Sequence, residues 1–283
     1  MDLNYFFYYN YNTPFINMKI VFDSSRKCHQ FSAMFANLKN FTDNVCIYIK
    51  TDHLYIQCLD DSHCCLFEAR LNSTWFKEYT FDETIDNGCI GINIAMLNKV
   101  LNTWTDTQEI TLETNPNTDK FSLNFENGNT TSGQFNKYFE LSLIDVQNEL
   151  MDVRLFDTLV DLTVDSKVFC SLISQLTIFD NSLTLTFNEE NIECVSSGSD
   201  GSMKALININ EVKEYAIPES TTLKQSYSLR YVQMMCQFNK LAGEIEMGFS
   251  EDKPMTMKYL LGDNNDPDSF VRIHLAPKII DEE

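Results

Sequence analysis

The feature that most constrains the fold is an internal duplication. An apolar stripe with helical spacing occupies residues 31–41 and returns with the same spacing in residues 169–179. Alternating strand patterns, a second apolar helix and a hairpin follow each stripe in the same order and at a near-constant offset. Each match alone is a common amphipathic pattern, but the shared order is hard to obtain by chance. The sequence therefore predicts an α+β fold of two similar units, each with two helices packed on short antiparallel strands.

The repeat also divides the chain. Residues 1–17 are rich in Asn, Tyr and Phe without periodicity, and we expect them to be an N-terminal extension. Residues 18–140 form the first predicted domain, and residues 158–283 form the second. Residues 141–157 join the two domains. Because this stretch is not rich in Gly or Ser, we expect a connector draped along the protein rather than a flexible linker.

Composition limits the class of protein. Of the 283 residues, 43% are hydrophobic, which suffices for one large core or two medium ones. The nine cysteines are odd in number and show no CxxC spacing, which is typical of small buried hydrophobes in a reducing compartment. No apolar run reaches the roughly 18 residues of a membrane span, and no signal peptide is evident. We therefore expect a soluble intracellular protein.

The charge of the chain is strongly negative. A net charge of −20 argues against nucleic-acid binding by the usual rule, which expects a basic surface. The total does not exclude a protein that is acidic outside and basic on one inner surface, because that depends on where the bases lie.

Motifs of enzymes and metal sites are missing from the sequence. There is no GxxxxGK[ST], GxGxxG, HExxH or GxSxG pattern. Asp263, Asp266 and Asp268 lack the central Gly and closing Glu of a calcium-binding EF-hand loop, and the four histidines are dispersed. We therefore predict no catalytic residue, no cofactor and no metal.

Several segments resemble a known family. Leu59-Asp60-Asp61-Ser62-His63 resembles its Met-Asp-x-Ser-His segment, and Ser228-Leu229-Arg230-Tyr231-Val232 resembles its Leu-Arg-Tyr-Leu helix. Gly91-Ile92-Asn93-Ile94 leading to Lys99 resembles its first-domain second helix, and Leu275-Ala276-Pro277-Lys278-Ile279 matches its C-terminus. Over residues 18–283 the chain is similar to the proliferating cell nuclear antigen family of DNA sliding clamps.

This resemblance implies a fold and a function. The fold is a homotrimeric ring of six similar domains, with helices lining the hole, a continuous outer sheet and an acidic exterior. The function is that of a DNA polymerase processivity factor, which encircles duplex DNA without sequence preference and tethers replication and repair enzymes. Implied partners are double-stranded DNA, polymerases and other enzymes bearing clamp-binding peptides, and a clamp loader, with no membrane. The implied location is the nucleus or the replication site of a large DNA virus. Rival hypotheses are a checkpoint-type or hetero-oligomeric clamp subunit, a monomeric processivity factor and, most distantly, an enzyme.

The resemblance implies that bases on or beside the four repeated helices face DNA. These DNA-binding candidates are Lys27, Lys39, Lys99, Lys167, Arg230 and Lys240. Their phosphate contacts would carry no sequence information and would weaken with salt, as suits a sliding ring. The family usually has Arg where this chain has Ser171 and Ser174, and Lys is common where Asn102 and Gln237 stand. We therefore expect a weak direct grip on DNA.

The resemblance also implies a hydrophobic partner pocket between the connector, the Asp-x-Ser-His segment and the C-terminus. Its candidate residues are Leu59, His63, Leu66, Met151, Val153, Pro254, His274, Ala276 and Pro277. These residues either pack in the core or form an exposed patch that binds peptides. His274 stands where the family usually has Tyr, so we expect a polar rim and a pH dependence near neutrality.

Subunit contacts are implied at two edge strands. The family pairs a strand near residues 136–141 of one subunit with one near residues 202–207 of the next. The interface candidates are Phe139, Leu141, Met203 and Ala205.

Overall fold

A computed structural model describes residues 18–22, 24–82, 88–115, 117–127, 135–146, 150–153, 156–262 and 268–278. The first half contains, in order, β1 (Met18–Val21), α1 (Ser25–Leu38), β2 (Asn44–Ile49), β3 (His53–Leu59), β4 (Cys65–Asn72), β5 (Glu78–Phe81), β6 (Cys89–Asn93), α2 (Ile94–Leu101), β7 (Gln108–Thr114), β8 (Lys120–Asn127) and β9 (Lys137–Ser142). The proposed extension at residues 1–17 lies outside the described residues.

The second half repeats this order element for element. It contains β10 (Val160–Asp165), α3 (Ser166–Leu176), β11 (Ser182–Phe187), β12 (Asn191–Gly198), β13 (Gly201–Asn208), β14 (Glu214–Ala216), β15 (Leu223–Ser228), α4 (Leu229–Cys236), β16 (Glu244–Phe249), β17 (Met255–Leu260) and β18 (Phe270–Leu275). Short 3-10 turns occupy Ser73–Trp75, Ile209–Glu211 and Gln237–Lys240. The predicted α+β fold with two helices in each half is confirmed.

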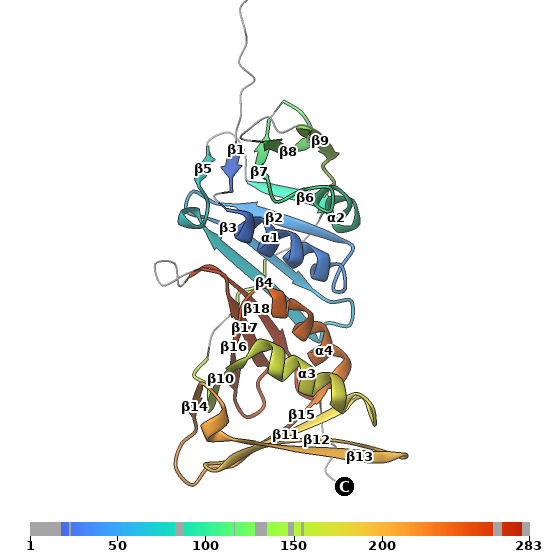
Figure 1. The fold of residues 1–283 in the computed structure, drawn as a ribbon, viewed down its shortest axis with the longest axis vertical. Helices are drawn as coiled ribbons and strands as arrows, with labels where there is room; N and C mark the ends of the chain where they lie inside the picture. Colours follow the sequence, from blue (N-terminus) through green and yellow to red (C-terminus); the bar gives the residue numbers. More distant parts are fainter. Residues whose placement is uncertain are drawn as a thin grey trace, which may run out of the picture.

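The helices form where an apolar stripe follows a capping residue. Ser24 caps α1 by accepting a hydrogen bond from the Lys27 N–H, and Asp165 caps α3 by accepting from the Lys167 and Val168 N–H groups. The stripe of each helix is buried against a sheet. Figure 1 shows all four helices on one side of the molecule, with the two halves stacked along its long axis.

Three antiparallel sheets make up the strand layers. The first half contributes β5-β1-β7-β8-β9, the second contributes β13-β12-β11-β15, and a nine-stranded sheet, β14-β10-β16-β17-β18-β4-β3-β2-β6, crosses both halves. The crossing is the pairing of β18 with β4, in which Ile273 lies opposite Phe67. Strands β9 and β13 are left as sheet edges.

The start of the connector is not a strand. Residues 141–146 alternate in the sequence as a strand would, but β9 ends at Ser142 and residues 143–146 form no strand. The Ile144 N–H donates to the Gly91 carbonyl at 3.0 Å, and a Cβ atom at position 91 would lie 2.1 Å from the Ile144 oxygen. This segment therefore lies against the β6 backbone where glycine leaves room for it.

No helix within the described ranges is long and apolar enough to cross a membrane.

Candidate functional site

Acidic and basic residues are distributed unequally on the helix side of the molecule. The chain has 41 acidic residues, yet none falls within α1, α2, α3 or α4. The bases on or just after these helices are Arg26, Lys27, Lys39, Lys99, Lys167, Arg230 and Lys240. All except Lys27 are exposed. Helices that carry spaced cations and no carboxylate favour a polyanion over other ligands, although Asp106 pairs with His29 of α1 and Asp165 caps α3.

Lys27 is the exception among the predicted DNA contacts. Its Nζ donates to the Trp75 carbonyl at 2.6 Å and lies over the Trp75 ring at 5.4 Å from the centroid. The ammonium is thus directed at the protein rather than at solvent. Arg26, which the sequence reasoning passed over, is exposed on the same helix.

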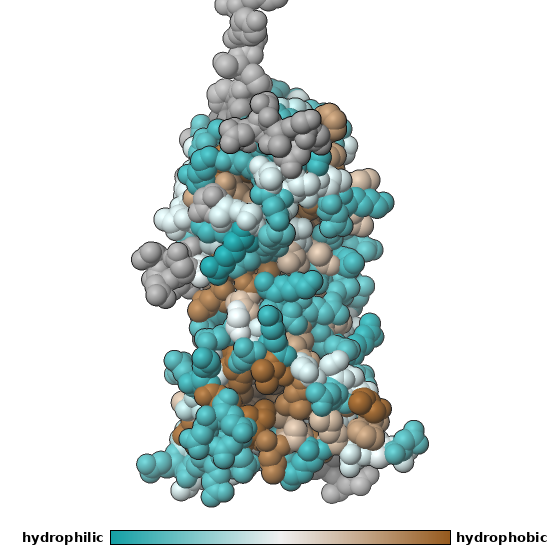
Figure 2. All heavy atoms as spheres, in the orientation of Figure 1, coloured by the Kyte–Doolittle hydropathy of each residue, from teal (hydrophilic) through white to brown (hydrophobic). Residues whose placement is uncertain are grey.

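Elsewhere on the helix side, this chain has uncharged side chains at positions where the family commonly has Arg or Lys. Ser171 and Ser174 are exposed on α3, and so is Val168. Gln237 is engaged at the junction of the halves, where its side-chain oxygen accepts from Asn40 at 2.6 Å. Figure 2 shows hydrophobic atoms gathered mainly over the second half on the side in view. These features accord with a weak direct grip on an anion.

On the face away from the helices, one row of side chains joins the two halves. Leu59 lies opposite Leu66, Leu66 opposite His274, His274 opposite Thr256 and Thr256 opposite Gly248, across β3, β4, β18, β17 and β16. We call this the Leu66 row. Strand register therefore places three of the predicted pocket residues side by side.

The other predicted pocket residues belong to the loop before β4, the connector and the segments next to β17 and β18. The Ala276 N–H donates to the Cys64 carbonyl at 3.0 Å, which ties the C-terminal segment to the loop that bears His63. Pro254 immediately precedes β17, Pro277 is partly exposed, and Met151 and Val153 belong to the connector. Met151 is 43% exposed, so this part of the connector presents an apolar side chain to solvent.

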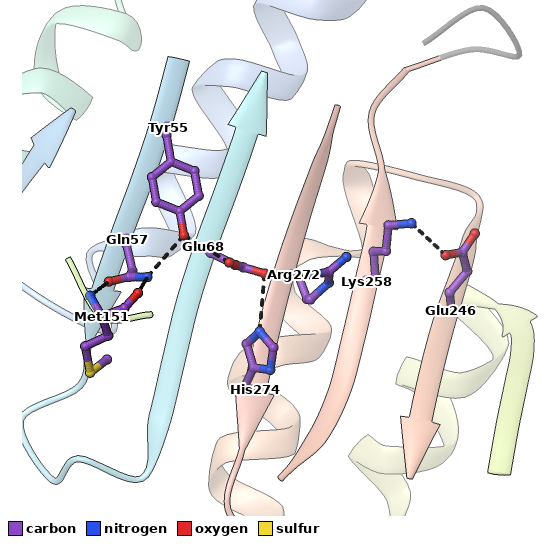
Figure 3. Close-up of polar contacts among 8 residues, drawn as sticks. All are labelled: Tyr55, Gln57, Glu68, Met151, Glu246, Lys258, Arg272 and His274. Atoms are coloured by element: carbon purple, nitrogen blue, oxygen red, sulfur yellow. Dashed lines mark hydrogen bonds and ion pairs between the residues drawn. The ribbon is translucent and has the colours of Figure 1, made fainter. Parts of the chain in front are cut away.

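A second, polar row runs beside the first. Gln57 lies opposite Glu68, Glu68 opposite Arg272, Arg272 opposite Lys258 and Lys258 opposite Glu246. Figure 3 shows this Glu68 row, with Gln57 reaching Met151 at one end and the Lys258–Glu246 ion pair at the other. The row links β3 and β4 of the first half to β18, β17 and β16 of the second.

His274 differs from its predicted role as a polar rim. It is only 8% exposed, and its Nε2 lies 3.3 Å from Glu68 Oε1. Burial would raise the pKa of the Glu68 carboxyl, but the hydrogen bond and charge of His274 and the charge of Arg272 outweigh burial and lower that pKa. The sequence could not reveal this pairing, because the partner of β18 is a strand of the other half.

A groove of about 650 Å³ opens next to His274 on this face. Its lining includes Phe156 of the connector and Thr158 just after the connector, and it reaches Asp161 and Glu214 on β10 and β14. Gly248 forms part of its floor, and a Cβ atom there would lie 2.5 Å from the Thr158 methyl group. Ile144 in the connector and Thr158 just after it thus each lie against a glycine of the nine-stranded sheet.

The predicted interface residues lie on the two sheet edges. Phe139 and Leu141 are on β9, and Met203 and Ala205 are on β13. Leu141 is buried in the core of its own half, whereas Phe139, Met203 and Ala205 are half-buried.

Several organising residues escaped the sequence reasoning. Gln57, Glu68 and Arg272 alternate with buried apolar residues along their strands, so their outward direction was readable. Their mutual contacts were not, because these depend on the register between halves. Among the described residues, no group of three or more His, Cys, Asp or Glu side chains is arranged to hold a metal ion. Asp263 and Asp266 lie outside these residues.

Comparison with known proteins gives consistent similarities. A family profile described as proliferating cell nuclear antigen, N-terminal domain, matches residues 26–150. The chain is 26% identical over 235 residues to proliferating cell nuclear antigen of Chaetomium thermophilum, covering 81% of this chain and 86% of that protein. It is 24% identical over 264 residues to proliferating cell nuclear antigen 1 of Plasmodium falciparum, covering 88% and 93%. It is 23% identical over 228 residues to proliferating cell nuclear antigen 2 of Drosophila melanogaster, covering 81% and 86%.

Proposed function

The chain belongs to the proliferating cell nuclear antigen family, and we propose that it works as a sliding clamp, a ring that encircles duplex DNA and serves as a DNA polymerase processivity factor. The observation that carries this proposal is one missing strand pairing in an otherwise complete repeat. Within the chain, β4 of the first half pairs with β18 of the second. Their counterparts, β13 and β9, are each an edge strand of one of the other two sheets, with no partner on the outer side among the described residues.

The repeat also supplies a register for the missing pairing. Leu123 pairs with Phe139 as Met257 pairs with Ile273, and Ser196 pairs with Met203 as Cys58 pairs with Phe67. Because Ile273 lies opposite Phe67 within the chain, we propose that Phe139 of one copy lies opposite Met203 of the next.

Such a contact joins two different surfaces, so it produces a closed ring when the rotation between copies completes a circle. Three copies of a two-domain chain would give a ring of six similar units. Both edges occur on the same chain, which favours a homotrimer over a mixed ring. A monomer would leave both edges unpaired, in a form prone to aggregation.

The exposed bases on or just after the helices would face DNA inside this ring. The acidic residues lie outside the four helices, so a net charge of −20 is compatible with a cationic inner wall. We propose Lys39, Lys99, Lys167, Arg230 and Lys240 as phosphate contacts, with Arg26 in place of Lys27.

Partner enzymes would dock on the opposite face. We propose that the Leu66 row, Met151 of the connector and the segment at Ala276 receive a clamp-binding peptide through its aromatic residues. Members of the family are non-enzymatic scaffolds, and we propose the same for this chain, with a clamp loader and replication enzymes as partners in the nucleus.

The test changes the two residues proposed to meet between copies. Phe139→Asp with Met203→Asp would place like charges directly opposite each other and should give single chains in light scattering at micromolar concentration. Phe139→Asp with Met203→Lys is the matched control and should restore the ring. The wild type should behave as a trimer and lengthen primer-extension products, and the Asp–Asp variant should do neither. A wild type that runs as a single chain would refute the proposal.

A further inference from the structure

One side chain anchors the middle of the connector to the sheet. Gln57 Nε2 donates to the Met151 carbonyl at 3.1 Å, and the Met151 N–H donates to Gln57 Oε1 at 2.7 Å. The two bonds imitate a hydrogen-bonded pair in an antiparallel ladder, with a side-chain amide in place of a backbone. Gln57 is only 5% exposed, so its amide depends on these partners. Figure 3 shows the amide facing the Met151 backbone.

The orientation of that amide is set by its neighbours. The Tyr55 hydroxyl donates to Glu68 Oε2 at 3.0 Å, so its oxygen is available to accept from Gln57 Nε2 at 3.1 Å. A rotated amide would point its oxygen at the Met151 carbonyl and would lose both bonds to Met151. The nitrogen must therefore face Tyr55 and the Met151 carbonyl.

The hydrogen bonds that link Glu68, Tyr55 and Gln57 form a relay, and the second half holds its first member, the Glu68 carboxylate. Arg272 Nη1 lies 3.0 Å and His274 Nε2 lies 3.3 Å from Glu68 Oε1. Glu68 is only 4% exposed, and the two basic groups compensate its buried charge. The second half thus fixes Glu68, Glu68 orients Tyr55, and Tyr55 orients Gln57.

The consequence lies in the side chains next to the anchor. Leu150 is 45% exposed and Met151 is 43% exposed, although both are apolar. With the Met151 backbone bonded to Gln57, both residues are held next to β3, two residues along that strand from Leu59. A peptide then meets an ordered wall and does not lose affinity in ordering one.

We propose that Gln57 is the positioning residue of the partner groove and that Tyr55 and Glu68 orient it. The proposed occupant is a partner peptide with an aromatic anchor, so this inference rests on the proposed function.

The experiment removes the side-chain amide of Gln57 and keeps a side chain of similar volume. In Gln57→Leu, the ring mass should be unchanged, and the Met151 amide should exchange hydrogen faster in the free clamp. Binding of a peptide of the pattern Gln-x-x-aliphatic-x-x-aromatic-aromatic should weaken about tenfold, which is what the loss of two hydrogen bonds predicts. Gln175→Leu, at an exposed position on α3, is the matched control and should leave both readouts unchanged.

A second variant tests the relay. Tyr55→Phe keeps both groups that bind Met151 but removes the hydroxyl, and it should weaken the peptide by a smaller factor while also speeding exchange at Met151. Unchanged exchange at Met151 in Gln57→Leu would overturn the inference, even if no peptide bound. A wild type that does not bind the peptide, with Met151 exchange still dependent on Gln57, would refute the proposed partner groove and leave the anchor intact.

Discussion

At the scale of single residues, one carboxylate organises the loop next to the Leu66 row. Asp60 accepts the N–H groups of Ser62 at 3.0 Å, Cys64 at 2.8 Å and Cys65 at 2.7 Å. It also accepts the hydroxyl of Tyr231, on α4 of the other half, at 2.7 Å. Burial would raise the pKa of Asp60, but the bonds from Tyr231 and the three N–H groups outweigh burial and lower it. The carboxylate therefore stabilises both the loop and the junction.

Replacing this carboxylate tests that role. Asp60→Asn should lower the free energy of unfolding at pH 7 by about 2 kcal/mol, because hydrogen bonds to a charged acceptor are among the stronger ones. The lowered pKa means that the wild-type advantage is present above the ordinary Asp pKa of about 3.9 and is lost as pH falls through the folded-state pKa. Urea unfolding at fixed protein concentration should show the gap closing below about pH 4. The exposed neighbour Asp61→Asn is the control, and a gap that keeps its full size from pH 7 down to pH 3 would contradict the assignment.

At the residue scale, the sequence indicated which segments lie together but not which side chains pair across neighbouring strands. The family resemblance grouped Leu59, Leu66 and His274 in one expected pocket, and strand register places them side by side, while their role in binding stays a prediction. The buried Glu68–His274 contact was missed, because alternation along a strand gives the face of a residue but not its neighbour on the next strand.

At the scale of elements, the four helices were the most predictable part of the chain. The apolar stripes at residues 31–41 and 169–179 overlap α1 and α3, but both helices begin and end before their stripes, at Ser25–Leu38 and Ser166–Leu176. The connector was less predictable, because Leu141–Val146 has the alternation of a strand while its path depends on Gly91 and Cys46. The Cys46 thiol donates to the Val146 carbonyl at 3.4 Å, a contact that no local pattern encodes.

The helices make a measurable prediction about salt. Lys99→Ala, Lys167→Ala and Arg230→Ala combined should reduce the slope of log affinity for DNA against log salt by about 0.9 for each phosphate that the variant no longer neutralises. A matched triple change at exposed bases off the helices, Lys50, Lys224 and Lys253, should leave the slope unchanged. Affinity titrations over a range of salt would measure both. Equal slopes in the two variants would show that the helices do not face DNA.

At the scale of the whole molecule, the exposed apolar residues near the free edges have a common explanation. Tyr138 on β9 is 63% exposed and Leu206 on β13 is 59% exposed. Large apolar side chains on an unpaired edge favour association, and a ring would bury both edges at once. The duplication would thus account for the proposed ring as well as for the fold of one chain.

The central claim is topological linkage to DNA, and retention on a linear duplex tests it most directly. The chain would be threaded at high concentration onto a duplex biotinylated at both ends, and the ends would then be blocked with streptavidin before transfer to high salt. Topological linkage predicts long retention when the ends are blocked after threading, rapid loss when they stay open, and little loading when they are blocked first. Dissociation governed by salt alone, whatever the state of the ends, would contradict it and indicate a protein that grips DNA through one face.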